Sequence, residues 1–403
     1  MPLADTRPVR PVNKEFTVLM ALLMSIVAIS IDALLPALGI IGSDLAVSHP
    51  NQAQYVISVL FGGMAIGELI AGPLSDALGR KRVLYVTVVL YLLGSVIGYL
   101  ADSLPMLLVG RFIQGIGVAG PYVSTVSIVR DKYEGREMAR IMSLVMMIFI
   151  MVPAIAPTLG QGILYLSGWR VIFLFYIVYA VLIMGWVYFR LEETLPPAKR
   201  IPFRLHDVLA GFRSVITHRR TLGYLMAMGF IFGSFMGYLN TAQQIFQVQF
   251  RTGEAFTLYF GGLALVFGAA SLTNARLVER LGMRYLARRA MAGMILVSLA
   301  FLFLQLVVAP TLPMLLVYLA VLFFCMGLLF GNLNALAMEP MGHIAGIAAA
   351  VIGFVSSLIS MTGGILIGQH YDGTLLPITL GFIVMGTLAL LSMRWGEREP
   401  RVH

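Results

Sequence analysis

Long apolar runs separated by short polar segments dominate the chain. Twelve of them reach about 20 residues or more, the length that an α-helix needs to cross a bilayer core. They lie approximately at residues 16–40, 52–74, 83–101, 104–129, 138–166, 170–190, 221–244, 255–275, 288–309, 312–337, 343–369 and 373–394. The pattern predicts an all-α polytopic membrane protein with twelve transmembrane helices. The first run is too long for a signal-peptide core, so we expect it to remain as a membrane helix.

One long polar stretch divides these runs into six and six. It contains Pro196, Pro197 and Pro202 and carries many cations. We therefore expect an N-terminal six-helix bundle at residues 1–190, a cytoplasmic central linker at 191–219 and a C-terminal six-helix bundle at 220–403.

Composition supports a membrane protein and excludes a soluble one. The chain is 59% hydrophobic and only 12% charged, whereas a soluble domain has about 25% charged residues. The net charge of +9 comes from cations in loops between apolar runs and not from a basic folded patch. We therefore expect the lipid bilayer as a partner, and no nucleic acid.

The cations also predict orientation. If both termini lie on the same side, 25 of the 28 Lys and Arg residues fall on that side. Short loops rich in Lys and Arg stay in the cytoplasm. The sequence thus predicts a multi-pass protein with both termini cytoplasmic.

The loop between the second and third runs is short and strongly basic. It reads Gly72-Pro-Leu-Ser-Asp76-Ala-Leu-Gly79-Arg80-Lys-Arg82. Arg130 and Asp131 end the fourth run at the same level. We predict a charge network there that closes the cytoplasmic side when the outer side is open.

A weaker copy of this loop follows the eighth run. Glu279 and Gly282 occupy the places of Asp76 and Gly79. A repeat in equivalent hairpins is typical of a duplicated transporter, with two bundles related by a pseudo-twofold axis and a site between them. The alternative is two unrelated basic loops.

Three ionisable residues, Asp32, Glu68 and Arg111, lie inside apolar runs, where each is costly to keep. Asp32 and Arg111 have similar depths, which suggests an ion pair, direct or bridged by water or Gln114. Asp32 would then bind and release a proton while Arg111 responds to its charge. The alternative is a permanent structural pair.

Glu68 has no second membrane cation to pair with. An unpaired charge is expensive there, so we expect this carboxyl to be protonated much of the time. It would serve as a second proton site or as an anchor for cationic substrates. Alternatively, it is a neutral acid bonded to a nearby carbonyl or hydroxyl group.

Further residues in the runs predict a cavity and a bend. Polar side chains that we expect to line a central substrate cavity are Gln114, Tyr122, Tyr238, Asn240, Gln243, Gln244, Asn332 and Asn334. In the fifth run, Pro153 and Pro157 remove backbone donors and force a kink, and Gly160 permits close packing. This motif is either an ordinary bend or a gate. The glycines from Gly115 to Gly120 match a dinucleotide fingerprint by letters only, because no strand precedes them.

Several of these motifs together resemble one family. They are Asp32-Ala-Leu-Leu-Pro36-Ala-Leu, the basic hairpin, Arg111-Phe-Ile-Gln-Gly-Ile-Gly117, the proline-rich fifth run, and Ala337-Met-Glu-Pro-Met-Gly-His-Ile-Ala-Gly346. In this order they resemble the Bcr/CflA group of drug:proton antiporters in the major facilitator superfamily. The resemblance implies proton coupling by Asp32 and Arg111, and associates the fifth-run motif with exporters. Glu68 departs from the family, which usually has glutamine there.

The predicted function is proton-coupled secondary active transport, as a multidrug efflux antiporter that works by alternating access and confers antibiotic resistance. The alternative is transport of one physiological metabolite, such as a sugar, amino acid or siderophore-like compound. The chain shows no metal-ligand cluster, nucleophile elbow or phosphate loop, so we expect no enzyme and no cofactor beyond the proton as coupling ion. We expect a monomer in the bacterial inner membrane that carries small amphipathic organic molecules.

Overall fold

The computed structural model of the chain describes residues 13–398, except the side chains of residues 136 and 139. Within these residues all regular elements are helical. The first half contains α1 (Lys14–Asp32), α2 (Leu38–Asp44), α3 (Tyr55–Leu78), α4 (Arg80–Leu100), α5 (Leu104–Lys132), α6 (Gly135–Ser167) and α7 (Arg170–Arg190), with short helices η1 (Leu35–Ala37) and η2 (Pro50–Gln54). The linker carries η3 (Pro197–Lys199) and α8 (Leu205–Thr217).

The second half begins with α9 (Arg219–Gln243), which a π-helical segment, η4 (Gln244–Gln249), extends. It continues with η5 (Gly253–Ala255), α10 (Phe256–Leu281), α11 (Met283–Val307), α12 (Leu312–Met338), η6 (Glu339–Ile344), α13 (Ala345–Gln369) and α14 (Leu376–Glu397). Eleven helical segments of the described chain are long and apolar enough to span a membrane, and one of them, Leu312–Gln369, contains both α12 and α13. The predicted twelve spans are therefore confirmed.

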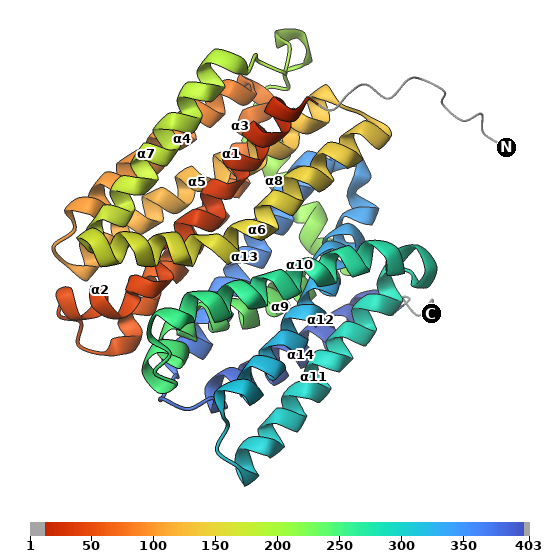
Figure 1. Cartoon of the computed structure of the whole chain (residues 1–403). Helices are drawn as coiled ribbons and strands as arrows, with labels where there is room; N and C mark the ends of the chain where they lie inside the picture. The colour runs from red at the N-terminus through yellow and green to blue at the C-terminus, as the bar shows by residue number, and fades with distance from the viewer. Residues whose placement is uncertain (1–12, 399–403) are drawn as a thin grey trace.

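The contacts between the halves follow a twofold pattern. The halves meet where α3 packs on α13 and where α6 packs on α10. By order along each half, α3 corresponds to α10 and α6 to α13, so the two contacts are equivalent. Figure 1 shows α6 and α10 facing each other between the two groups of helices. This arrangement agrees with the predicted pair of six-helix bundles.

The two basic hairpins have the same backbone design. Gly79, between α3 and α4, has a φ of 102°, and Gly282, between α10 and α11, has a φ of 78°. Side chains other than that of glycine rarely adopt such angles, so glycine allows each helix to end and the next to begin at once. The repeat seen in the sequence is a repeated turn in the structure.

Glycines bring the helices of the first half into backbone contact. A Cβ atom on Gly115 of α5 would collide with the carbonyl oxygen of Leu60 on α3, and one on Gly117 would collide with the backbone of Tyr91 on α4. Lipid offers no hydrophobic drive for helix association, so close approach through small residues holds such helices together. The glycine stretch therefore serves packing and not nucleotide binding.

Two features of the fold differ from the sequence prediction. The first span is not one helix over residues 16–40: α1 ends at Asp32, and η1 begins at Leu35 around Pro36. The linker, predicted only as a polar stretch, contains the 13-residue helix α8. The proline explains the break.

Candidate functional site

Asp32 lies in the last turn of α1, directly before the break at η1. It is 5% exposed. The phenols of Tyr176 on α7 and Tyr238 on α9 are within electrostatic range of its carboxyl. Asp32 therefore belongs to the first half but lies near a side chain of the second.

Arg111 is fully buried and does not pair with Asp32. Its Nε donates to the carbonyl of Val56 at 2.9 Å, its Nη2 to the carbonyl of Ser30 at 2.9 Å, and its Nη1 to Oε1 of Gln114 at 2.6 Å. No ion pair joins Asp32 and Arg111 in the described chain, so the prediction of a direct pair is wrong. The guanidinium is satisfied by neutral acceptors from α1, α3 and α5, and this leaves Asp32 without a cationic partner among the described residues.

Gln114 does not bridge the two charges either. Its amide donates to the hydroxyl of Ser95 on α4 at 2.8 Å, while its oxygen accepts from Arg111. Gln114 and Arg111 are both fully buried. Gln114 thus sits in the interior of the first half.

Glu68 lies in the contact between α3 and α13, where the two halves meet. It is 7% exposed, and its Oε2 has no hydrogen-bond partner within the described chain. A Cβ atom built on Gly353 of α13 would lie 2.7 Å from this oxygen. Ser357, also on α13, lies beside the carboxyl. An ionised Glu68 would therefore place its charge directly against the other half.

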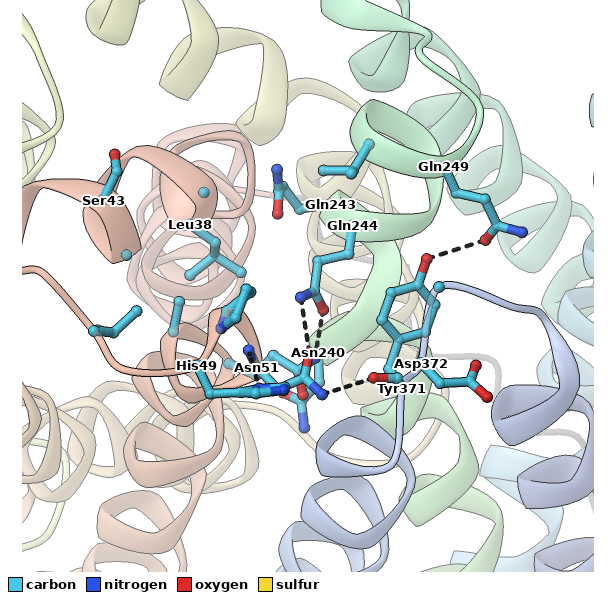
Figure 2. Close-up of a pocket in the computed structure, with 18 residues that line it drawn as sticks. Leu38, Ser43, His49, Asn51, Asn240, Gln243, Gln244, Gln249, Tyr371 and Asp372 are labelled. Carbon is cyan, nitrogen blue, oxygen red and sulfur yellow. Dashed lines mark hydrogen bonds between the residues drawn. The ribbon is translucent and has the colours of Figure 1, made fainter.

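Neutral polar side chains join the halves at one end of the molecule. We call this the far end, and the opposite end, which holds the Gly72–Arg82 loop and the linker, the hairpin end. Asn51 of η2 donates through Nδ2 to the carbonyls of Gln369 at 3.1 Å and Tyr371 at 2.8 Å. Its Oδ1 accepts from Gln244 of η4 at 2.9 Å, as Figure 2 shows.

Two more contacts extend this seam towards the membrane interior. Gln54 donates to Gln244 at 2.5 Å, and Asn240 of α9 donates to Ser58 of α3 at 2.9 Å. The hydrogen bonds that Asn51, Gln54 and Ser58 make with the second half all lie at this far end. The amides therefore hold the far end closed.

A cavity of about 750 Å³ opens beside the seam. Figure 2 shows Gln243, Gln244 and Asn51 around it. Asp372 lies at its margin and accepts hydrogen bonds from the hydroxyl and the backbone N–H of Thr374. These bonds hold the pKa of Asp372 below its usual range, so this side of the cavity is negatively charged at neutral pH.

The hairpin end carries the predicted charges in a network. Arg80 donates to Asp76 at 2.5 Å and to Asp131 at 2.8 Å. Arg130 forms no ion pair in the described chain, so only three of the four charged residues come together. Oδ2 of Asp76 lies 3.5 Å from the position of a Cβ on Gly346, in the first turn of α13. The ion pairs of this network all lie within the first half. Asp76 is the member of the network that also lies beside the second half, at Gly346.

The remaining predicted residues are dispersed. Tyr238 is buried, and its ring stacks on Phe260 at 5.9 Å. Asn332 bonds to Asn274 within the second half, whereas Asn334 is exposed. Tyr122 is half-buried near Glu68. The other predicted residues lie at or beside contacts between helices. They are Gly72, Gln243, Pro153, Pro157 and Gly160.

α6 stays continuous through both of its prolines, and Gly160 allows it to approach Ala33, the residue after Asp32. The sequence reading missed Asn51, Gln54, Gln369 and Tyr371. No spacing links positions that are more than 300 residues apart, and their only signal was a cluster of amides at the start of the second span.

Comparison with known proteins identifies the family to which this arrangement of helices belongs. The family model described as Major Facilitator Superfamily matches residues 20–364. The chain belongs to this superfamily. It is therefore a multi-pass membrane transporter and not an enzyme, as the sequence predicted.

Its relatives include proteins of the Bcr/CflA type. An uncharacterized MFS-type transporter, YdgK of Bacillus subtilis, is 30% identical over 395 residues, which are 95% of this chain and 97% of that protein. A bicyclomycin resistance protein homolog of Haemophilus influenzae is 26% identical and covers 94% of both chains. Multidrug resistance protein MdtL of Escherichia coli is 35% identical over 42% of this chain and 43% of its own.

Solved structures agree on the fold. The human organic anion transporter MFSD10 (TETRAN) matches with a TM-score of 0.71 at 17% identity, over 96% of this chain and 100% of its own. The xylose transporter XylE of Escherichia coli, in a partially occluded inward-open conformation, matches with a TM-score of 0.68 at 16% identity, over 96% and 98%. At such identities the likeness concerns the fold and not the substrate.

Proposed function

We propose that this transporter exports small amphipathic organic molecules, including drugs, in exchange for protons. The observation that carries the proposal is Asp32, a buried carboxyl that has no cationic partner in the described chain and lies near Tyr238 of the opposite half. A group that is neutral when protonated and costly when ionised can convert proton binding into movement of the halves. The names of the Haemophilus and Escherichia relatives support a drug as cargo.

The proposed orientation places the hairpin end in the cytoplasm of a bacterial inner membrane, with both chain termini on that side. The support is the distribution of cations along the sequence, where 25 of the 28 Lys and Arg residues fall in segments assigned to one side of the membrane. Protons would then enter from the far end and leave at the hairpin end. A potential of 100 mV adds about 2.3 kcal/mol for each charge moved through the membrane.

Glu68 supplies a second proton-dependent step. A proton on this carboxyl allows α3 to lie against Gly353 of α13, as seen here. Loss of the proton leaves a charge in a contact without a cation, which favours separation of the two helices. Arg111 holds α1, α3 and α5 together around the site and so transmits changes at Asp32.

The cargo site in this proposal lies between the halves, and the predicted residues that support it are Tyr238 of α9, near Asp32, and Tyr122 of α5, near Glu68. Closure at the far end relies on neutral amides, whereas closure at the hairpin end relies on Asp76 against α13. The proton is the coupling ion, and the working unit is a monomer.

The test uses purified protein in vesicles with an imposed pH gradient and a panel of unrelated cationic dyes and antibiotics. The parent should move several of them uphill, while Asp32→Asn and Glu68→Gln should bind but not accumulate them. Asp102→Asn, which removes an exposed acid outside the membrane spans, is the matched control and should transport normally. If both membrane variants accumulate the compounds as well as the parent, the mechanism is wrong. If the parent moves a single metabolite and none of the drugs, the cargo is a physiological solute instead.

A further inference from the structure

The linker between the halves exposes large apolar side chains outside the membrane spans. Ile201, Phe203, Leu205 and Leu209 are 65%, 43%, 63% and 59% exposed. All four lie within nine residues of a segment otherwise rich in polar and charged side chains. Clustered apolar groups at a loop are costly in water, so a partner is expected to cover them.

The position of α8 places this cluster near the membrane surface. A Cβ on Gly211 would collide with Ile347, and the ring of Phe212 lies 6.5 Å from the ring of Phe354. Phe354 is about 14 Å along α13 from its first residue, at 1.5 Å per residue. The headgroup region on each side of a bilayer is only roughly 5–8 Å thick. α8 therefore lies beside the part of α13 that enters the bilayer.

The apolar face of α8 is wider than the surface that α13 covers. Gly211 lies against Ile347 of α13, and Val215, one turn further along α8, is also buried. At about 100° per residue, Leu205, Leu209 and Ile216 fall within about 40° of one another, beside this buried arc and not opposite it. The stripe formed by Leu205, Leu209 and Ile216 thus lies next to the face of α8 that packs on α13, and extends the apolar surface beyond that contact.

Cations border the stripe. Lys199, Arg204 and Arg213 are exposed, and Asp207 is the one acid within α8. An apolar stripe edged by basic side chains is typical of helices that lie in the plane of a membrane surface. Each such cation favours an anionic headgroup nearby.

We propose that the linker segment Ile201–Ile216 is a membrane-surface element whose apolar stripe inserts among acidic lipid headgroups of the leaflet at the hairpin end. A second copy of the chain fits less well, because four side chains bury far less than the 1,200 Å² or so that a stable dimer needs. The backbone N–H of Ile201 donates to the carbonyl of Asp76 at 3.1 Å. Lipid bound here therefore acts on α3 and on α13, the helices that join the halves, whichever direction transport takes.

The experiment measures where the stripe lies in the full-length protein. Cys325→Ala removes the single native cysteine, and Leu209→Cys receives a polarity-sensitive fluorophore. Ala210→Cys, the next residue on the exposed polar side of α8, is the matched control. Both proteins are placed in vesicles of phosphatidylcholine with or without phosphatidylglycerol. Lipids with a spin label near the headgroup and aqueous iodide serve as quenchers.

The Leu209 fluorophore should be quenched by the spin-labelled lipid and shielded from iodide, and the Ala210 fluorophore should show the reverse. Phosphatidylglycerol should strengthen lipid quenching at Leu209, and the combined Arg204→Gln and Arg213→Gln variant should lose that increase. Iodide quenching of Leu209 equal to that of Ala210 would place the stripe in water and overturn the proposal. Shielding of Leu209 from both quenchers would mean that protein covers it, which overturns the proposal equally. Lipid quenching that ignores phosphatidylglycerol would refute the preference for acidic headgroups.

Discussion

Nδ2 of Asn51 donates a hydrogen bond to the backbone carbonyl of Tyr371 at 2.8 Å, although 320 positions separate the two residues. The same side chain contacts the carbonyl of Gln369 and the amide of Gln244. The side chain of one asparagine of the first half thus makes three hydrogen bonds with the second. These bonds make Asn51 the main link between the halves at the far end, and all of them join neutral groups.

Asn51→Ala should open the far end. It removes three hydrogen bonds of about 0.5–1.5 kcal/mol each, so the open population should rise at least about tenfold. The measurement is the rate at which a membrane-impermeant thiol reagent, added from the far side, labels Ser58→Cys in a Cys325→Ala background. Gln52→Ala is the control, because the Gln52 side chain bonds only to the backbone of Ser48 in the described chain. Equal labelling of all three proteins would show that Asn51 does not hold the far end.

Gly353→Ala should displace the Glu68 carboxyl from its place against α13. The added methyl group would meet Oε2 of Glu68 at 2.7 Å in a tightly packed contact. Such overpacking costs about 1–3 kcal/mol, measured as a lower thermal unfolding temperature of the purified protein. Adding Glu68→Ala should recover about 1 kcal/mol or more, because it removes the colliding atom.

The control for this change is Gly331→Ala, since a Cβ at Gly331 meets no neighbouring heavy atom within 4 Å. It should leave stability unchanged or raise it by up to about 1 kcal/mol, the helix preference of alanine over glycine. A loss at Gly331 as large as that at Gly353 would point to a general intolerance and not to contact with Glu68.

Asp76→Asn should impair transport without unfolding the protein. Asparagine keeps the shape of the side chain but removes the charge that faces Gly346 in the first turn of α13, where a helix N-terminus favours a negative charge. Transport in vesicles should fall while the unfolding temperature changes little. Normal transport by this variant would exclude a role of Asp76 in closing the hairpin end.

Arg80→Gln should destabilise the same region. The Arg80 side chain is only 4% exposed and pairs with two carboxylates, so its loss should cost about 2–3 kcal/mol. Arg82→Gln is the control, because Arg82 is exposed and forms no ion pair in the described chain. Similar unfolding temperatures for the two variants would show that the network adds no stability.

Gly115→Ala should disturb the packing of α3 on α5. Its Cβ would collide with the backbone oxygen of Leu60, which cannot turn aside as a side chain can. We expect a cost of about 3 kcal/mol in thermal unfolding. Gly262→Ala in α10, where nothing lies within 4 Å, should be nearly neutral. A stable Gly115→Ala protein would mean that the two helices can separate at little cost.

The sequence by itself determined the spans, their division into halves and the two basic hairpins. These depend on local properties, namely the length of apolar runs and the glycines that end α3 and α10. It also identified Asp32, Glu68 and Arg111, because an ionisable residue in an apolar run is conspicuous without knowledge of its neighbours.

Only the tertiary structure decided what these residues contact. Depth along two helices suggested that Asp32 and Arg111 meet, but helix rotation turns Arg111 towards the carbonyls of Ser30 and Val56. The far-end seam of Asn51, the contact of Glu68 with Gly353 and the docking of α8 on α13 likewise join distant parts of the chain. Apolar patterning specifies that a helix crosses the membrane, whereas its rotation and neighbours depend on packing among all the helices, which no local pattern encodes.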